Sequence, residues 1–411
     1  MPSSRRHFMF GAGGCAACMS GLARAHVLPT DLPPLIDVDY EPVDADERGM
    51  WQSMEQIEET IQNSPQRLNA PDLQGYTGGI VERLMGRETP DLRIYLMRSA
   101  LFNASMFPTG MMVVNTGLMA RVRNEAQLAA VLGHETGHYY RKHSIERYRS
   151  LRHTTAAMAW VGAVANIGAG VYAVGPSGGR DWIYAAQGIN TLVTMSVFQM
   201  SRSQEEEADA YGVSLMAHSG YSPDAASQIW KQLIDERKAS AKERDKRYRD
   251  RSASLLSTHP PTEDRMKNLA DTAASLAARN HQDTTDGRAE WLAAVAPHRA
   301  MLLDEQIKLN DPGASLYLVE SLAQDGWNGL LRYNEGEIYR LRGEAGDREK
   351  AANAYAAATA LPDAPAEAWR AHGYAQLKAG NVEDGRNALS RYLAMNPDAN
   401  DVGVVRYTLN Q

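Results

Sequence analysis

Cysteine is nearly absent from the sequence, which has 411 residues and only two cysteines. Cys15 and Cys18 both lie in residues 1–25, a segment with the features of a cleaved export signal. Removal of this segment would leave a protein without cysteine, which excludes stabilisation by disulfide bonds. Lipid attachment at either cysteine stays open, although neither follows the leucine that usually precedes a lipidated cysteine.

Three features of the first segment indicate export. Arg5 and Arg6 form a charged start without an acidic residue, and a short apolar run rich in glycine and alanine follows. Residues 23–25, "ARA", match a small-x-small cleavage site. The start "SRRHF" also resembles a twin-arginine signal. We therefore expect a periplasmic protein, with the twin-arginine route as a candidate; a buried N-terminal helix is the alternative interpretation.

An excess of positive charge is also lacking. The chain has 43 lysines and arginines against 50 aspartates and glutamates, a net charge of −7, so a nucleic-acid partner is not expected. Its composition, 44% hydrophobic, is sufficient for a core, and its length suits two domains. The charged run over residues 231–251 predicts a solvated helix or a mobile loop.

Long hydrophobic runs are scarce. Residues 154–176 carry no charge, but they are rich in alanine and glycine and contain Asn166. This composition favours a buried helix or hairpin near the predicted active site over a membrane span. Peripheral contact with a membrane stays open.

Two histidines and a glutamate in residues 133–138, "GHETGH", form the pattern His-Glu-x-x-His. An α-helix returns to the same face after four residues, so His134 and His138 can direct both imidazoles at one ion. Glu135 lies about 100° round the helix from His134, close enough to reach a water molecule held by a metal. The pattern favours a catalytic metal site over a helix with two surface histidines.

A catalytic zinc ion takes three protein ligands and leaves one position open. His143 is a candidate for the third ligand, but it lies five residues after His138, and Arg141 occupies the position where a turning glycine is needed. Glu205 is the stronger candidate, because it opens the segment "EEEAD" on a second predicted helix. The predicted ligands of one zinc ion per chain are therefore His134, His138 and Glu205.

Asp209 follows Glu205 by four residues, so the two carboxylates face the same way from a helix. Asp209 can then accept a hydrogen bond from the free ring N–H of a ligand histidine and orient it. Ala208 and Gly212 are small and lie near the same face, which permits close approach of the histidine helix. Weaker candidates for the ligand, because they lack helical spacing to Asp209, are Glu206 and Glu207.

Capping signals delimit both helices. Asn124, with Gln127 three residues later, predicts the start of the histidine helix, and Ser203 with Glu206 predicts the start of the second helix. The second helix is expected to end at Gly220.

Two strands are predicted before the histidine helix, over residues 92–107 and 110–119, with turn residues between them. Because the rest of the chain is dominated by helical patterns, the predicted fold class is α+β and mainly α.

The C-terminal part of the sequence repeats itself. Gly336 and Gly343 align with Gly373 and Gly380, each 37 residues further on, in a pattern that resembles tetratricopeptide repeats. A degenerate earlier copy is a candidate over residues 299–325, and an unrelated helical bundle is the alternative. The predicted organisation is an export signal over residues 1–25, a zinc peptidase domain over 26–278, a linker over 279–288 and a repeat domain over 289–411.

Four motifs together resemble the gluzincin peptidases of the HtpX and CAAX-protease family: "NEAQLAAVLGHETGHYYRKH", "SRSQEEEADAYG", "HSGYSP" and "STHPPTEDR". The segment "FNASMFPTGMMVVNTGL" resembles the strand that precedes the zinc helix in this family. The match spans roughly residues 45–400 and is closest to BepA-type periplasmic metalloproteases with C-terminal tetratricopeptide repeats. The resemblance implies a zincin-like metallopeptidase domain followed by an α-helical repeat domain.

The same resemblance implies roles for individual residues. The three predicted ligands bind zinc, and Glu135 is the general base. His259, in "THP", resembles a residue that in some relatives occupies the open zinc position and holds the enzyme latent; termination of a helix is its alternative role. Arg265, in "PTEDR", matches a family arginine near the site.

The predicted reaction is hydrolysis of a peptide bond. Zinc lowers the pKa of its water molecule, Glu135 takes the proton and passes it to the leaving amine, and His259 or Arg265 helps to stabilise the oxyanion. An extended substrate is expected to add a strand beside residues 111–115.

These features predict a zinc-dependent endopeptidase of the cell envelope that degrades misfolded or misassembled outer-membrane proteins. The repeats are expected to dock unfolded substrates or the outer-membrane assembly machinery. The alternative is a chaperone or adaptor of envelope protein assembly whose protease site is mostly latent. The intact Glu135 favours catalysis, because a scaffold has no use for that carboxylate.

Overall fold

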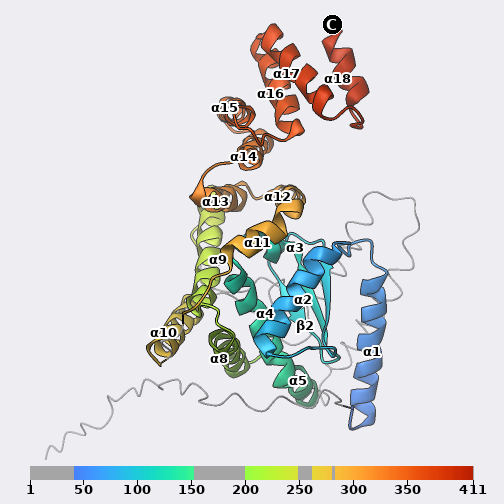
Figure 1. Ribbon diagram of the computed structural model, residues 1–411, viewed down its shortest axis with the longest axis vertical. Helices are drawn as coiled ribbons and strands as arrows, with labels where there is room; N and C mark the ends of the chain where they lie inside the picture. Colours follow the sequence, from blue (N-terminus) through green and yellow to red (C-terminus); the bar gives the residue numbers. More distant parts are fainter. Residues whose placement is uncertain (1–40, 152–199, 249–261, 280–282, 411) are drawn as a thin grey trace, which may run out of the picture.

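The computed structural model describes residues 41–151, 200–248, 262–279 and 283–410 (Figure 1). Predictions that fall outside these ranges, and so stay predictions, are the export signal with its two cysteines, the apolar run over residues 154–176 and the role of His259. Among the described residues, no helix combines the length and the apolar character that spanning a membrane requires.

A small sheet contains strands β1 (Arg93–Met97), β2 (Ala104–Met106) and β3 (Met111–Asn115). The strand order is β1-β3-β2, with β3 parallel to β1 and antiparallel to β2. The strand predicted over residues 92–107 is therefore two strands. Because β3 pairs on both sides, the expectation that a substrate adds a strand beside residues 111–115 is wrong.

The strand predicted over residues 110–119 also ends early, because Thr116 begins helix α3 (Thr116–Arg121). The Thr116 hydroxyl donates to the Ser99 carbonyl at 2.9 Å and accepts from the Ser99 N–H at 2.8 Å. A Cβ at Gly117 would lie 2.3 Å from the Ala100 carbonyl oxygen. Glycine therefore lets the loop that follows β1 cross close to α3.

Alternate residues of the sheet enter two different cores, as strand geometry requires. One face packs with α2 (Pro71–Met85) and α4 (Glu125–Tyr140) through Ile94, Leu96, Met112 and Val114. The other face packs with α1 (Ala45–Gln62) and α5 (His143–Leu151) through Tyr95, Met97, Met111 and Val113. Helix α4, which carries the histidine motif, is thus buried against the sheet.

Three further helices pack beside or behind α4: α8 (Arg202–His218), α9 (Asp224–Glu243) and α10 (Glu263–Arg279) (Figure 1). The charged run predicted over residues 231–251 begins within α9, so the helical form of that prediction holds as far as Glu243.

The next helices share a core with the histidine helix. These are α11 (Arg288–Val295), α12 (Arg299–Ile307), α13 (Pro312–Leu322) and the 3-10 helix η2 (Ala323–Asp325). The 3-10 helix η1 (Ala296–His298) connects α11 to α12 and has no buried residue. Trp291 is fully buried, and its ring N–H donates to the Val122 carbonyl at 2.8 Å. Thr285, within the predicted linker, forms a bridge with Tyr221. The boundary at residues 279–288 stays a prediction.

Two helix pairs and a last helix extend away from the sheet (Figure 1). They are α14 (Gly329–Arg342) with α15 (Asp347–Thr359), α16 (Ala366–Ala379) with α17 (Val382–Met395), and α18 (Val402–Leu409). The mainly helical α+β fold class predicted from the sequence is therefore confirmed.

The glycines that align in the sequence have matching positions in the two helix pairs. Gly343 and Gly380 cap α14 and α16 in the left-handed conformation, with φ of 68° and 91°. A Cβ at Gly336 would lie 2.4 Å from the Tyr355 ring, and one at Gly373 would lie 2.8 Å from the Leu389 side chain. The pairs are thus structurally equivalent, while their membership of the tetratricopeptide repeats stays a prediction.

Candidate metal centre

Helix α4 begins as the sequence predicts. The Asn124 side chain accepts a hydrogen bond from the Gln127 N–H at 2.9 Å. The Gln127 side chain accepts from the N–H of Arg123, one residue before the cap, at 3.0 Å. Both bonds satisfy N–H groups that the helix itself leaves without a partner, so they fix where α4 starts.

Helix α8 begins two residues earlier than the sequence predicts. The capping box consists of Ser201 and Gln204, and Ser203 already lies inside the helix. The prediction of Ser203 and Glu206 is therefore wrong. The same serine-x-x-acceptor spacing occurs two residues upstream, where Ser201 has the extended backbone that a cap requires.

Small residues bring α4 and α8 into close contact. A Cβ at Gly212 would lie 2.8 Å from the His134 backbone nitrogen. A Cβ at Gly133 would lie 3.3 Å from the Gly212 Cα, and one at Gly137 would lie 3.2 Å from the Ala208 carbonyl oxygen. This confirms the close approach expected from Ala208 and Gly212, and it places side chains of both helices around one point.

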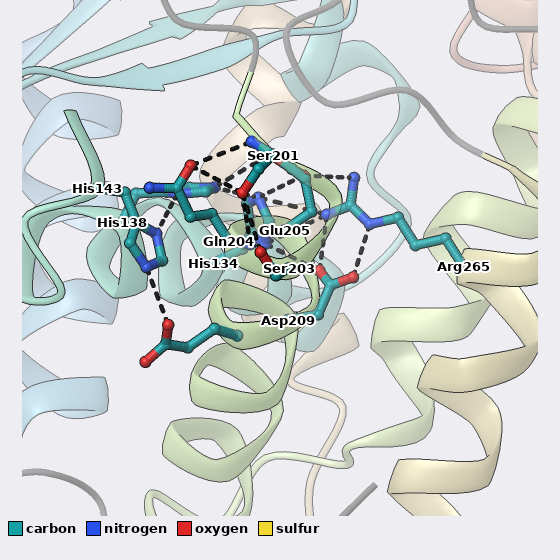
Figure 2. Close-up of polar contacts among 10 residues, drawn as sticks. His134, His138, His143, Ser201, Ser203, Gln204, Glu205, Asp209 and Arg265 are labelled. Atoms are coloured by element: carbon teal, nitrogen blue, oxygen red, sulfur yellow. Dashed lines mark hydrogen bonds and ion pairs between the residues drawn. The ribbon is translucent and has the colours of Figure 1, made fainter. Parts of the chain in front are cut away.

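The three predicted ligands meet at this crossing (Figure 2). The Nε2 atoms of His134 and His138 are 3.0 Å apart, and Glu205 oxygens lie 3.6 Å and 3.5 Å from them, respectively. Ligands at the usual zinc distances in a tetrahedron are roughly 3.3 Å apart. Two imidazole nitrogens and a carboxylate at this spacing fit a divalent metal such as zinc.

Asp209 lies beside the first of these histidines. Its Oδ1 is 2.8 Å from the His134 Nδ1, on the ring nitrogen that does not face Glu205. The Arg265 guanidinium donates to both Asp209 oxygens at 2.7 Å and lies 3.3 Å from a Glu205 oxygen. The Arg265 carbon Cζ also stands 4.2 Å from the centre of the Trp230 ring. Arg265 therefore holds the two acidic side chains of α8 in place.

The electrostatics of this group keep Asp209 charged. Burial alone would raise the pKa of the Asp209 carboxyl, but the Arg265 guanidinium and the hydrogen bond with His134 lower it to about 2. Burial likewise would lower the pKa of Arg265, yet the carboxylates of Asp209, Glu205 and Glu135 raise it. An ionised Asp209 can accept a hydrogen bond from the Nδ1–H group of His134. This bond orients the His134 ring so that its other nitrogen faces a metal.

His138 has a different neighbour, which sequence reasoning missed. Its Nδ1 lies 2.8 Å from the Nδ1 of His143, and the His143 Nε2 lies 3.2 Å from Glu207. Glu207 also pairs with Arg141 at 2.5 Å. His143 thus stands behind His138 rather than beside Glu205. The sequence offers His143 as a candidate ligand, but its spacing from His138 gives no sign of this supporting position.

Glu135 is 2% exposed and follows His134 on α4. Its charge acts on Arg265, so it belongs to the same electrostatic environment as the other acidic groups. A buried carboxylate next to a metal position has the chemistry required of a general base.

A family comparison bears directly on this site. The family model of "Peptidase family M48" matches residues 68–273. This range includes all of α4 and α8 and the first part of α10, from Glu263 to residue 273. The chain belongs to peptidase family M48. This confirms the predicted family and, with it, the predicted enzyme class of metalloendopeptidase.

Individual M48 relatives are similar over part of their length. The "Beta-barrel assembly-enhancing protease" of Escherichia coli (strain K12) is 26% identical over 261 residues, covering 61% of this chain and 50% of the relative. The "Putative beta-barrel assembly-enhancing protease" of Vibrio cholerae is 27% identical over 252 residues, 57% of this chain and 47% of the relative. The "Mitochondrial metalloendopeptidase OMA1" of Schizosaccharomyces pombe is 25% identical over 199 residues, 48% of this chain and 52% of the relative. The chain spans about half the length of the curated relatives it matches.

Proposed function

We propose that this M48 protein is a zinc-dependent endopeptidase. The observation that carries the proposal is the meeting of His134, His138 and Glu205 donor atoms, within 4.8 Å of one another, at a crossing of two buried helices. Two histidines and one glutamate form a common ligand set of catalytic zinc in peptidases. One zinc ion per chain is expected.

The residues around the ligands have complementary tasks in hydrolysis. A bound zinc ion would supply Lewis acidity and would lower the pKa of a water molecule. Glu135 would act as the general base, which accepts a proton from the attacking water and returns it to the leaving amine. Asp209 holds the His134 ring, and Arg265 acts mainly by positioning Asp209 and Glu205, since three of its contacts are to these two residues.

The edge of the sheet offers a position for an extended substrate. In the described part of the sheet, β2 (Ala104–Met106) forms one edge and packs beside α4. A peptide can pair with the outer side of β2 and so run along the histidine helix. We therefore place the extended substrate beside residues 104–106 of β2 instead of beside residues 111–115 of β3.

The decisive experiment separates metal binding from catalysis. The Glu135→Gln protein should retain zinc and lose degradation of casein, because the ligands remain and the general base does not. Glu206→Gln is the matched control, since within the described ranges the Glu206 side chain forms an ion pair with Arg202 on the surface of α8. Unchanged casein cleavage by Glu135→Gln would refute Glu135 as the base and, with it, this proposal.

The substrates proposed are misfolded or misassembled proteins of the cell envelope, including outer-membrane proteins, and the proposed location is the periplasm. Two relatives whose names refer to β-barrel assembly support this proposal. The helix pairs α14–α17 would dock substrates or the assembly machinery. Fractionation of cells, followed by comparison of outer-membrane protein turnover with the wild type and with Glu135→Gln, tests both location and substrate class.

A further inference from the structure

His143 lies behind the metal position, between the buried His138 and Glu207, whose side chain is 42% exposed (Figure 2). His143 itself is 1% exposed and begins α5, directly after α4. One of its ring nitrogens faces His138 at 2.8 Å, and the other faces Glu207 of α8 at 3.2 Å. His143 therefore connects a proposed ligand on one helix with a carboxylate on the other.

The direction of the hydrogen bonds follows from the chemistry of imidazole. If the Nε2 of His138 offers its lone pair to a metal, the His138 proton resides on Nδ1 and is donated to the Nδ1 of His143. The His143 proton must then reside on its own Nε2, where Glu207 accepts it. In this series of hydrogen bonds, His138 donates to His143 and His143 donates to the Glu207 carboxylate.

We propose that His143 and Glu207 are positioning residues, which hold the His138 ring in the tautomer and orientation that bind the metal. Asp209 and Arg265 hold His134 in the corresponding way on the other side of the site. Arg141 completes the chain, because its ion pair at 2.5 Å fixes the far side of Glu207. Partners of this kind behind a ligand contribute strongly to metal affinity.

Zinc affinity, measured by competition with a chromophoric chelator, tests the proposal without reference to proteolysis. His143→Ala and Glu207→Gln should each weaken zinc binding about 10–100-fold. His143→Asn should recover much of the affinity, because its amide oxygen can accept from His138 where Nδ1 did. The controls are Glu206→Gln and His218→Ala on the same α8 helix, where the Glu206 side chain is 38% exposed and His218 is exposed.

The melting temperature of the metal-free proteins separates positioning from a general loss of structure. Wild-type affinity in His143→Ala would overturn the proposal, and so would a loss that His143→Asn does not restore. The inference rests on the proposed zinc site, but the two fail differently. A wild type that binds no zinc refutes the site, whereas a wild type that binds zinc and an unaffected His143→Ala refute only the role of His143.

A second inference comes from the helix pairs, independently of the metal. A pocket of about 560 Å³ lies between α14, α15 and α16. Its surface is hollowed by small side chains and bordered by aromatic rings, including Ala351, Ala371, Ala375, Tyr339, Tyr355 and Tyr374. Four cationic side chains and two carboxylates line it, in a chain whose net charge is −7. The pocket is thus a local positive region on an acidic protein.

The charges in the pocket are not equally engaged. Glu337 pairs with Arg340 at 2.6 Å and accepts from the Tyr355 hydroxyl at 2.6 Å. Arg348 of α15 and Lys378 of α16 are exposed, and the described residues contain no ion-pair partner for either. We propose that the pocket binds an acidic peptide segment, with these two cations contacting its carboxylates and the tyrosines contacting its apolar side chains.

Fluorescence anisotropy with a labelled ten-residue peptide of alternating glutamate and leucine tests this proposal. The Glu135→Gln protein is used, so peptide binding is measured whether or not the proposed protease activity exists. Arg348→Glu combined with Lys378→Glu should weaken binding at least 10-fold. Arg386→Glu combined with Arg406→Glu, an equal charge change on exposed residues outside the pocket, should not. Equal losses in both double variants, equal binding of a lysine–leucine peptide, or no binding at all would overturn it.

Discussion

Two helix crossings in this protein use the same packing device for different purposes. At the crossing of α4 and α8, a Cβ on Gly212 would lie 2.8 Å from the His134 backbone. At the crossing of α16 and α17, a Cβ on Gly373 would lie 2.8 Å from the Leu389 side chain and 3.0 Å from the Gly385 carbonyl. Glycine permits close approach at both.

The side chains that flank each crossing make the difference. Around Gly212 they are histidines and carboxylates, held by a buried arginine. Around Gly373 they are apolar, and Leu389 belongs to a small hydrophobic cluster. Close approach of two helix backbones therefore occurs at both crossings. Only the crossing of α4 and α8 also has metal-ligand side chains on both facing surfaces, because helical spacing places them there.

The largest predicted effect comes from removing the charge that balances the metal crossing. Arg265→Ala should cost about 3–5 kcal/mol in the free energy of unfolding, because it leaves Asp209 buried without its cation. Arg370→Ala in helix α16 should cost less than about 1 kcal/mol, since both side chains of its ion pair with Asp401 are 32% exposed. Urea unfolding in the presence of a chelator measures both values. Equal costs would contradict the contrast.

Overpacking the two crossings should give the next largest effect. Gly212→Ala and Gly373→Ala should each cost about 1–3 kcal/mol, with the smaller cost at Gly373, where the Leu389 side chain can move. Only Gly212→Ala should also weaken zinc binding, because it pushes on the His134 backbone. Chelator competition on both variants distinguishes them, and a loss of zinc affinity in Gly373→Ala would show that the crossings are coupled.

Removing the charge on the outer partner of His134 should weaken metal binding in addition to any cost to the fold, and that cost is limited because Arg265 still faces a Glu205 oxygen at 3.3 Å. Asp209→Asn keeps the shape of the side chain and should weaken zinc binding about 10–100-fold. Asp363→Asn, a change at an exposed residue between α15 and α16, provides the comparison. Retention of full zinc affinity by Asp209→Asn would mean that His134 needs no acidic partner.

A smaller, pH-dependent effect is expected at Asp347, the first residue of α15. Hydrogen bonds from Arg342 lower the pKa of the Asp347 carboxyl from 3.8 to about 2. A carboxyl with a lowered pKa stabilises the folded state above its unfolded value and loses that contribution as the pH falls through its folded value. The difference in unfolding free energy between the wild type and Asp347→Asn should therefore be constant above about pH 5 and shrink as the pH falls from about 4 towards 2. A difference that grows on acidification would contradict this sign.

Local spacing explains which parts of the site could be predicted from the sequence. His134 with His138, and Glu205 with Asp209, each follow the four-residue repeat of a helix, so their shared faces are fixed by local structure. The small residues of α8 then indicate which surfaces meet. The position of Arg265 came from family resemblance, because nothing local connects α10 with α8.

The features that were missed depend on turns and on contacts distant in sequence. Lys142 adopts a positive φ of 56°, which turns the chain so that His143 returns behind His138. The sequence has no glycine at this turn, so the five-residue spacing from His138 excludes His143 as the third ligand but does not indicate its position behind His138. The central position of β3 depends on β1 and β2 pairing with it from either side, and strand order of this kind is not encoded in the strand itself.

The zinc content of the purified protein, compared with that of Glu205→Ala and Glu206→Ala, tests the central claim most directly. Elemental analysis should find about one zinc ion per chain in the wild type and in Glu206→Ala, and a large loss in Glu205→Ala. A wild type without a divalent metal, or a Glu205→Ala protein that retains the full amount, would contradict a metal centre shared between α4 and α8.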